Sequence, residues 1–206
     1  MIMKSLVAFT LMMSAAALAA QTTVPARVVP VIFETALGRI TLEVDAGHAP
    51  ITAANFLRYV DGHFYDGGFV DRAVRPDNTT RHDVEIQVIQ FQINRARAKE
   101  GFPAIQLERT SLTGLTHVDG AISMARGGAD SATASFFIAI GDQHELDFGG
   151  RRNADGQGFA AFGRVVDGMD VVKKIQQAPT QPAGGQGAFG TETLSPTIAV
   201  TRAYRQ

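Results

Sequence analysis

Short segments with the two-residue periodicity of β-strands recur along this chain, and they constrain its fold more than any other feature. Residues 39–44 alternate cleanly, with Ile40, Leu42 and Val44 on one face of the expected strand and polar side chains on the other. Leu37 and Gly38 have the composition of a hairpin turn that joins this segment to a strand at 31–36. Further segments rich in β-branched and aromatic residues predict strands at 85–93, 120–124, 136–140, 159–165 and 197–203, the last of them pairing near the first.

Only two segments have the spacing of an amphipathic helix. Pro50 suits the first turn of one helix, apolar residues recur behind it at three- and four-residue intervals, and Asp61-Gly62 ends the run. The second helix is expected over residues 169–176. These elements predict a mainly β fold, a closed antiparallel β-barrel of about eight strands capped by two α-helices, because closure removes the edge strands that would otherwise be exposed.

Length and composition favour a single domain. Of the 206 residues 45% are hydrophobic, which is enough for a substantial core. Residues 177–194 are rich in Gly, Pro and Gln and are expected to form a surface loop. The formal net charge of −1 provides no cationic field that would attract nucleic acid, so nucleic acid is not an expected partner.

The first nineteen residues have the organisation of an export signal. Lys4 is followed by an apolar run over residues 6–18, and Ala17-Leu18-Ala19 matches the small residues that signal peptidase requires. We therefore expect cleavage after Ala19 and a periplasmic or secreted domain over residues 20–206, with no membrane contact once the signal is removed. The alternative is an uncleaved anchoring helix. The chain has no cysteine, which excludes disulfides and a lipid-modified cysteine anchor.

Other catalytic patterns are weak in this sequence. Ser123 does not lie in a Gly-x-Ser-x-Gly segment, which argues against hydrolase chemistry. The histidines share no metal-ligand spacing, so no metal or other cofactor is expected, and surface or loop positions are predicted for them. They are His48, His63, His82, His117 and His144.

Three segments near the middle of the chain resemble one family closely. Residues 120–128 contain Gly-Ala-Ile-Ser-Met-Ala, residues 134–138 read Ala-Ser-Phe-Phe-Ile, and residues 159–165 contain Phe-Gly-Arg-Val. Their order and spacing resemble those of the cyclophilins, and the resemblance covers about residues 31–204. It implies a cyclophilin-like barrel and peptidyl-prolyl cis-trans isomerase activity on proline-containing peptides or unfolded exported proteins, performed by a monomer without a metal or cofactor.

The resemblance also assigns roles to particular residues. Arg72 occupies the place of the cyclophilin catalytic arginine, although Val70-Asp71 precedes it where the family has Phe-His. The remaining positions imply a proline pocket with an aromatic floor, an amide that orients the arginine, and backbone groups that pair with the peptide on the N-terminal side of the proline. The substrate-binding residues implied in this way are Val88, Gln90, Ala125, Arg126, Phe137, Leu146 and Phe159, with Phe137 as the floor and Phe159 where histidine is usual.

The reaction explains why an arginine is useful. Amide resonance opposes rotation about an X-Pro bond with a barrier of ~18–20 kcal/mol, and no nucleophile is needed to cross it. In the twisted transition state the prolyl nitrogen regains a lone pair that a fixed guanidinium N–H can bind, whereas the planar nitrogen accepts poorly. One such bond contributes about 1.5–3 kcal/mol, so an apolar pocket that holds the substrate must supply the rest.

Several positions depart from the family pattern and keep a second interpretation open. Phe91-Gln92 replaces a glycine pair, Ser135 replaces a glutamine, and Glu145 replaces a tryptophan. Gln87 is expected to make the proline pocket less apolar. These departures favour a cyclophilin-fold module that binds peptides with little or no turnover. Arg72, together with Gln90 and Phe137, favours the enzyme. A small-molecule carrier barrel is a third and weaker possibility.

Overall fold

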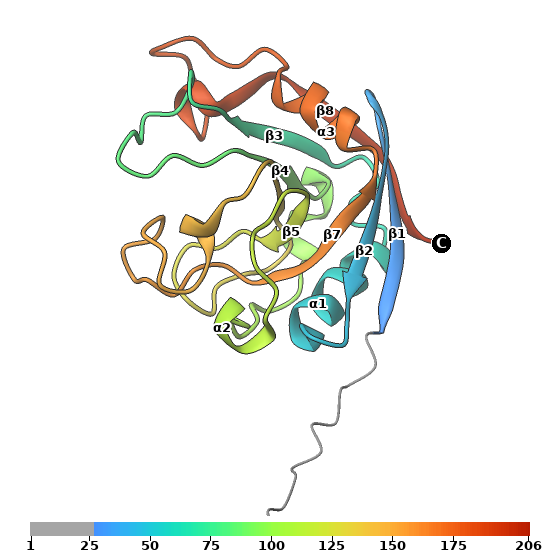
Figure 1. The fold of residues 1–206 in the computed structure, drawn as a ribbon. Coiled ribbons are helices and arrows are strands. Elements are labelled where there is room, and N and C mark those ends of the chain that lie inside the picture. Colours follow the sequence, from blue (N-terminus) through green and yellow to red (C-terminus); the bar gives the residue numbers. More distant parts are fainter. Residues whose placement is uncertain (1–26) are drawn as a thin grey trace, which may run out of the picture.

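The computed structural model describes residues 27–206, and eight antiparallel strands close into the expected barrel (Figure 1). Around the barrel the order is β1-β2-β7-β5-β6-β4-β3-β8, and β8 pairs with β1 to close it. The strands are β1 (Val28–Thr35), β2 (Gly38–Asp45), β3 (Phe69–Val74), β4 (Val88–Gln92), β5 (Ala121–Met124), β6 (Phe136–Ala139), β7 (Ala161–Asp167) and β8 (Thr193–Arg205). The predicted signal peptide lies outside the described residues.

Aromatic side chains fill the interior of the barrel. Phe33 of β1 lies 5.2 Å from Tyr65 and 5.3 Å from Phe136, measured between ring centroids, and Phe91 stacks on Phe136 at 4.6 Å. All four rings are buried, with 1% exposure or less. Large rings in edge-to-face and stacked contacts contribute much of the apolar burial that stabilises a barrel of this size.

The two predicted helices cover opposite ends of the barrel (Figure 1). Helix α1 (Pro50–Asp61) begins with the expected proline and inserts Phe56 into the aromatic interior. Helix α3 (Met169–Gln176) begins after Gly168, whose φ of 89° and close approach to Arg39 O would not accept a side chain. A third helix, α2 (Thr110–Thr113), was not predicted because a single turn leaves no periodicity to detect. Two 3₁₀ turns, η1 (Arg95–Glu100) and η2 (His144–Leu146), lie in the connections.

Strand β3, which carries Arg72, is absent from the sequence-based prediction. The reason is a β-bulge: the pairing of β3 with both β4 and β8 shifts register between Val70 and Arg72. The extra residue disrupts the two-residue alternation and places Asp71 and Arg72 in the middle of the strand. Bulges redirect side chains, and this one places Arg72 opposite Gln90 of β4.

The segment 177–194 is more than the surface loop that its composition predicted. It returns to the barrel through a bridge between Thr180 and Leu194 and contains a 3₁₀ turn, η3 (Gly190–Glu192). Glu192 is only 6% exposed. The Gly- and Pro-rich composition of this segment correctly indicated an irregular backbone. Composition alone could not show which of its side chains would be buried.

Alternation along the strands divides neighbouring residues between the two faces of the barrel wall. Phe136 of β6 lies in the barrel core, whereas Phe137 joins a separate apolar cluster on the outer face, with Val74, Ile86, Val88 and Leu146. This second cluster marks the candidate site.

Candidate active site

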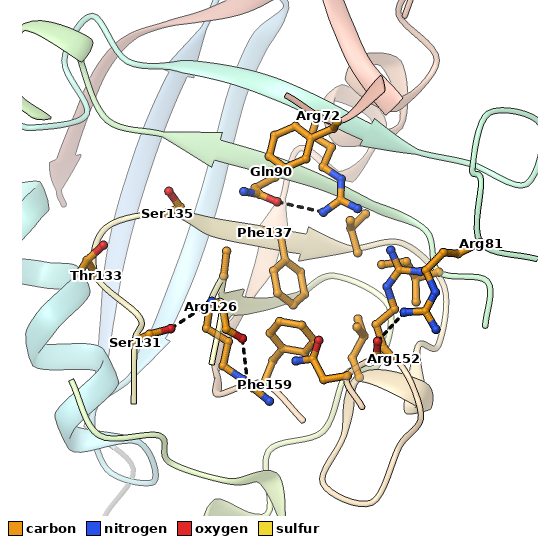
Figure 2. A pocket seen from close by; sticks show the side chains of 17 residues that line it. Arg72, Arg81, Gln90, Arg126, Ser131, Thr133, Ser135, Phe137, Arg152 and Phe159 are labelled. Atoms are coloured by element: carbon orange, nitrogen blue, oxygen red, sulfur yellow. Dashed lines mark hydrogen bonds between the residues drawn. The ribbon is translucent and has the colours of Figure 1, made fainter. Parts of the chain in front are cut away.

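A cavity of about 470 Å³ lies against the outer cluster, and all eight residues that the sequence singled out line it (Figure 2). The volume is within the range of small-molecule and peptide-side-chain sites. Arg72 comes from β3, Val88 and Gln90 come from β4, Phe137 comes from β6, and the others come from the loops that follow β5 and β6. Nine further residues also line the cavity: Arg81, Ile86, Gly127, Ser131, Thr133, Ser135, Arg152, Asn153 and Phe189.

The floor of the cavity is aromatic and aliphatic. The Phe137 and Phe159 rings meet edge to face, with centroids 5.3 Å apart and planes at 90°. Val88, Leu146 and Ile86 surround Phe137 and are each at most 4% exposed. Phe159 therefore provides an aromatic wall, and the arrangement offers an apolar depression of the kind that a pyrrolidine ring would fill.

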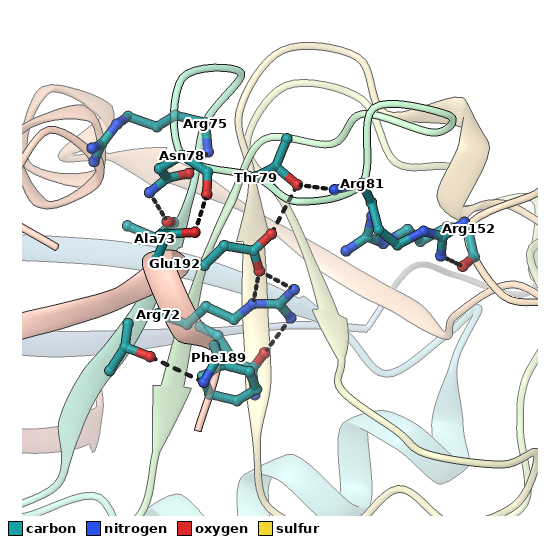
Figure 3. Close-up of polar contacts among 12 residues, drawn as sticks. Arg72, Ala73, Arg75, Asn78, Thr79, Arg81, Arg152, Phe189 and Glu192 are labelled. Carbon is teal, nitrogen blue, oxygen red and sulfur yellow. Dashed lines mark hydrogen bonds and ion pairs between the residues drawn. The ribbon is translucent and has the colours of Figure 1, made fainter. Parts of the chain in front are cut away.

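Arg72 is held rigidly at the rim of this depression (Figure 3). Its Nε and Nη2 donate to Glu192 Oε2 at 2.8 and 2.6 Å, and its Nη1 donates to Gln90 Oε1 at 3.3 Å. The guanidinium also lies 4.7 Å from the ring centroid of Phe189. The predicted contact with Gln90 is present, but Glu192 is the stronger constraint because its bonds are charge-assisted and shorter.

Glu192 and Phe189 are site residues that the sequence reasoning missed. Both lie in the segment interpreted as a surface loop, 120 positions from Arg72 in the case of Glu192. Glu192 Oε1 also accepts a hydrogen bond from Thr79 Oγ1 at 2.9 Å, which fixes the carboxylate. An isolated glutamate in a Gly-rich segment gave no sequence signal for this contact.

Replacing Glu192 by glutamine tests whether it positions Arg72. A neutral amide weakens two charge-assisted bonds, so we expect kcat/KM to fall about fivefold with little change in KM. In an Arg72→Ala background the same substitution should have no further effect on kcat/KM. A drop that persists in that background would show that Glu192 acts by another route.

Ala125 and Arg126 adopt unequal roles. Ala125 N–H donates to Ser135 O at 2.9 Å, so this group is already used within the protein. The Arg126 side chain is 1% exposed: Nη1 and Nη2 bind Asp155 at 2.8 and 2.9 Å, and Nε donates to Gly158 O at 2.7 Å. The hydrogen bonds from Arg126 to the Asp155 carboxylate, together with one from the Gln157 backbone, lower the pKa of Asp155 to about 2. Arg126 lines the cavity, and among residues 27–206 no acceptor binds its backbone N–H.

The departures from the family pattern mostly lie away from the cavity. Gln87 does not line it, because Gln87 Oε1 accepts from Gln176 Nε2 of α3 at 3.3 Å, and the expectation of a less apolar pocket is therefore wrong. Phe91 points into the barrel core. Glu145 binds Arg151 at 2.8 Å outside the cavity. Ser135 does line the cavity, and its hydroxyl binds Gln92.

His117 lies in the loop between α2 and β5, which agrees with the predicted surface or loop position, but its side chain is in the interior. It is fully buried, its Nδ1 lies 2.7 Å from Asp147 Oδ1, and its Nε2 lies 2.9 Å from Ser123 Oγ. In a neutral imidazole whose Nδ1 donates to the carboxylate, Nε2 accepts from the serine hydroxyl. Ser123 is itself fully buried, which keeps its hydroxyl from a substrate. The imidazole instead stacks beneath Phe137 at 5.9 Å and 15°, so it supports the pocket floor.

The Asp147 carboxylate, which binds the buried His117, makes the stability of the protein sensitive to acid. Burial raises the pKa of Asp147, but hydrogen bonds from His117 and His144 outweigh it and hold the pKa below its ordinary value of 3.8. A lowered folded-state pKa stabilises the protein above pH 3.8, and this contribution is lost as the pH falls through the folded value. We expect Asp147→Asn to be less stable at pH 7 and to lose less stability between pH 5 and 2 in urea titrations. Parallel pH profiles for the two proteins would contradict this assignment.

Comparison with known proteins agrees with the geometry of the site. The family model for cyclophilin type peptidyl-prolyl cis-trans isomerase/CLD matches residues 30–203. The chain is 37% identical to a peptidyl-prolyl cis-trans isomerase of Acinetobacter baylyi over 152 residues, which are 73% of each chain. It is 34% identical to peptidyl-prolyl cis-trans isomerase B of Escherichia coli over 155 residues, 75% of this chain and 88% of that protein.

A solved structure shares the same architecture. The crystal structure of a cyclophilin type peptidyl-prolyl cis-trans isomerase from Cryptosporidium parvum aligns with 87% of this chain and 98% of its own, with a TM-score of 0.66 and 15% sequence identity. That likeness concerns the fold, whereas the family match spans nearly all of the described residues. The chain therefore belongs to the cyclophilin-type peptidyl-prolyl cis-trans isomerases.

Proposed function

We propose that this protein catalyses rotation about X-Pro bonds with Arg72 as the catalytic residue. The supporting observation is the placement of a guanidinium, fixed by Glu192 and Gln90, at the rim of an apolar depression floored by Phe137. A proline ring in that depression brings the prolyl nitrogen toward the Arg72 N–H groups. The Arg72 donor then stabilises the nitrogen lone pair that forms as the bond twists.

Binding and orientation fall to the other cavity residues. Val88, Leu146 and Phe159 exclude water around the ring, and the Arg126 backbone N–H binds a carbonyl on the N-terminal side of the proline. Excluding water strengthens the Arg72 contact because the local dielectric falls. No covalent step and no redox step is required.

A protease-coupled isomerisation assay on short Ala-Pro peptides tests this function. We expect acceleration of the slow cis-to-trans phase in proportion to protein concentration. Binding of the same peptides without acceleration would support the alternative, a cyclophilin-fold peptide-binding module. The positions of Gln87, Phe91 and Glu145 away from the cavity remove three of the sequence departures that favoured that alternative.

We also propose that the protein is exported and acts on exported or unfolded polypeptides as a monomer. The support is the order of Lys4, the apolar run and Ala17-Leu18-Ala19. Within residues 27–206, no helix is long and apolar enough to cross a membrane. Fractionation of cells that express the full chain should yield periplasmic or secreted protein that begins at Ala20. Full-length protein in the inner membrane would support the anchoring helix instead.

A further inference from the structure

The cavity has two chemically different ends (Figure 2). The hydroxyls of Ser131, Thr133 and Ser135 lie at one end, and the guanidinium groups of Arg81 and Arg152 lie at the other, with Phe137 between them. The Arg126 backbone, which the proposed function assigns to the N-terminal side of the proline, lies toward the hydroxyl end. A peptide that crosses Phe137 therefore continues toward Arg81 and Arg152 after its proline.

Arg152 differs from the other cations of the cavity. Arg72 is paired with Glu192, Arg126 with Asp155, and Arg81 with Asp83. For Arg152 no carboxylate lies within 4.0 Å among the described residues, and the hydrogen bond that its guanidinium makes there is from Nη1 to Val84 O at 3.1 Å.

The surroundings of Arg152 are unfavourable for an unpaired cation. Burial lowers the pKa of Arg152, and the charges of Arg72 and Arg81 lower it further, which outweighs the opposite effect of Glu192 and Asp83. An arginine stays protonated, so the structure bears this electrostatic cost. A bound anion would offset it.

The neighbouring residue points to the same ligand chemistry. Asn153 also lines the cavity, and its Nδ2 is buried without an acceptor in the part of the chain that the structure describes. Arg81 Nη1 donates to Arg152 O at 2.7 Å, which fixes the two arginines relative to each other (Figures 2 and 3). Two guanidinium groups thus lie at one end of the cavity, beside an amide N–H that has no acceptor among the described residues, and carboxylate oxygens accept from such donors.

We propose that Arg152, assisted by Arg81 and Asn153, binds a carboxylate on the C-terminal side of the substrate proline, so that the protein prefers X-Pro sequences followed by an acidic group. The proposal rests on the proposed function for the direction of the peptide. The acidic group is either an aspartate or glutamate side chain or the free C-terminus of a short peptide, and these sources share the same recognition chemistry.

Three peptides that differ only after the proline distinguish these sources. The first has glutamate at the second position after proline and an amidated C-terminus, the second has glutamine there with the same amide, and the third has glutamine with a free C-terminus. Exchange rates measured by NMR report isomerisation without a coupling protease. We expect kcat/KM for the glutamate peptide to exceed that for the amidated glutamine peptide about three- to tenfold, as for a solvent-accessible charged contact.

Arg152→Gln should reduce this ratio, measured between the two amidated peptides within the variant, to near one. Arg39→Gln is the matched control, because it removes the same charge from an arginine that is 59% exposed and outside the cavity. The control should retain the preference, and added salt should weaken the preference in the natural protein.

The outcomes separate this inference from the proposed function. Equal rates on all three peptides would overturn the inference while leaving the isomerase intact. A preference that survives Arg152→Gln, or that disappears equally in Arg39→Gln, would overturn it as well. A higher rate for the free C-terminus alone would assign the subsite to a terminal carboxylate. If no peptide were isomerised, the proposed function would fail. The ratio of Kd values for the same peptides, measured by calorimetry, would then still decide the acidic preference.

Discussion

Replacing Arg72 by alanine is expected to reduce kcat/KM about ten- to a thousandfold, because the variant loses the donor that binds the prolyl nitrogen only in the twisted state. Arg72→Lys should recover little of this activity. An ammonium cannot reproduce the planar geometry that lets one guanidinium bind Glu192 on one edge and Gln90 on another. The measurement is steady-state isomerisation of an Ala-Pro peptide.

The structure changes the expected effect of this variant on stability. The sequence assigns Arg72 a catalytic role and gives no sign that this residue contributes to stability. In the structure its side chain is 18% exposed and neutralises Glu192, which would keep only its bond from Thr79. We therefore expect a loss of about 1–3 kcal/mol in Arg72→Ala, most of it recovered in Arg72→Ala/Glu192→Gln.

That double variant is the control for the activity measurement. It should regain stability without regaining activity. Full activity in Arg72→Ala would show that Arg72 is not the catalytic arginine. The nearby Arg75 could not take over the role, because it lies outside the cavity and binds the Gln176 carbonyl.

Phe137→Ala should lower stability and peptide affinity together. The ring is 4% exposed, and removing a buried phenylalanine costs about 3–5 kcal/mol. The variant also loses the floor of the proline depression and the surface on which His117 stacks. Chemical denaturation and calorimetry with an Ala-Pro peptide measure the two effects.

The adjacent Phe136 provides a matched control. It lies on the opposite face of β6, in the barrel core, so Phe136→Ala should lose a similar free energy of unfolding. Its folded fraction should still bind peptide because Phe136 does not line the cavity. Equal loss of affinity in both variants would show that general destabilisation, rather than the floor itself, explains the Phe137 effect.

The sequence by itself determined the elements that depend on local pattern. The alternation of apolar and polar residues predicted β2. Apolar residues at three- and four-residue spacing predicted the two longer helices, which begin at Pro50 and after Gly168. The number of strands predicted the closed barrel. The eight candidate residues surround one cavity because each lies within or beside a segment whose sequence resembles the family, and a strand in register carries its side chains to a fixed face.

Tertiary structure decided what depends on contacts between distant segments. The bulge that aims Arg72, the carboxylate of Glu192 that holds it, and the burial of His117 beneath Phe137 each arise where two or three chain segments meet. The charge of Arg152 is also decided by the fold, because among residues 27–206 the folded chain leaves no carboxylate within 4.0 Å of it. The sequence gives the type of each side chain. Its contacts and its burial, and therefore its contribution to stability, depend on how distant segments of the chain fold against it.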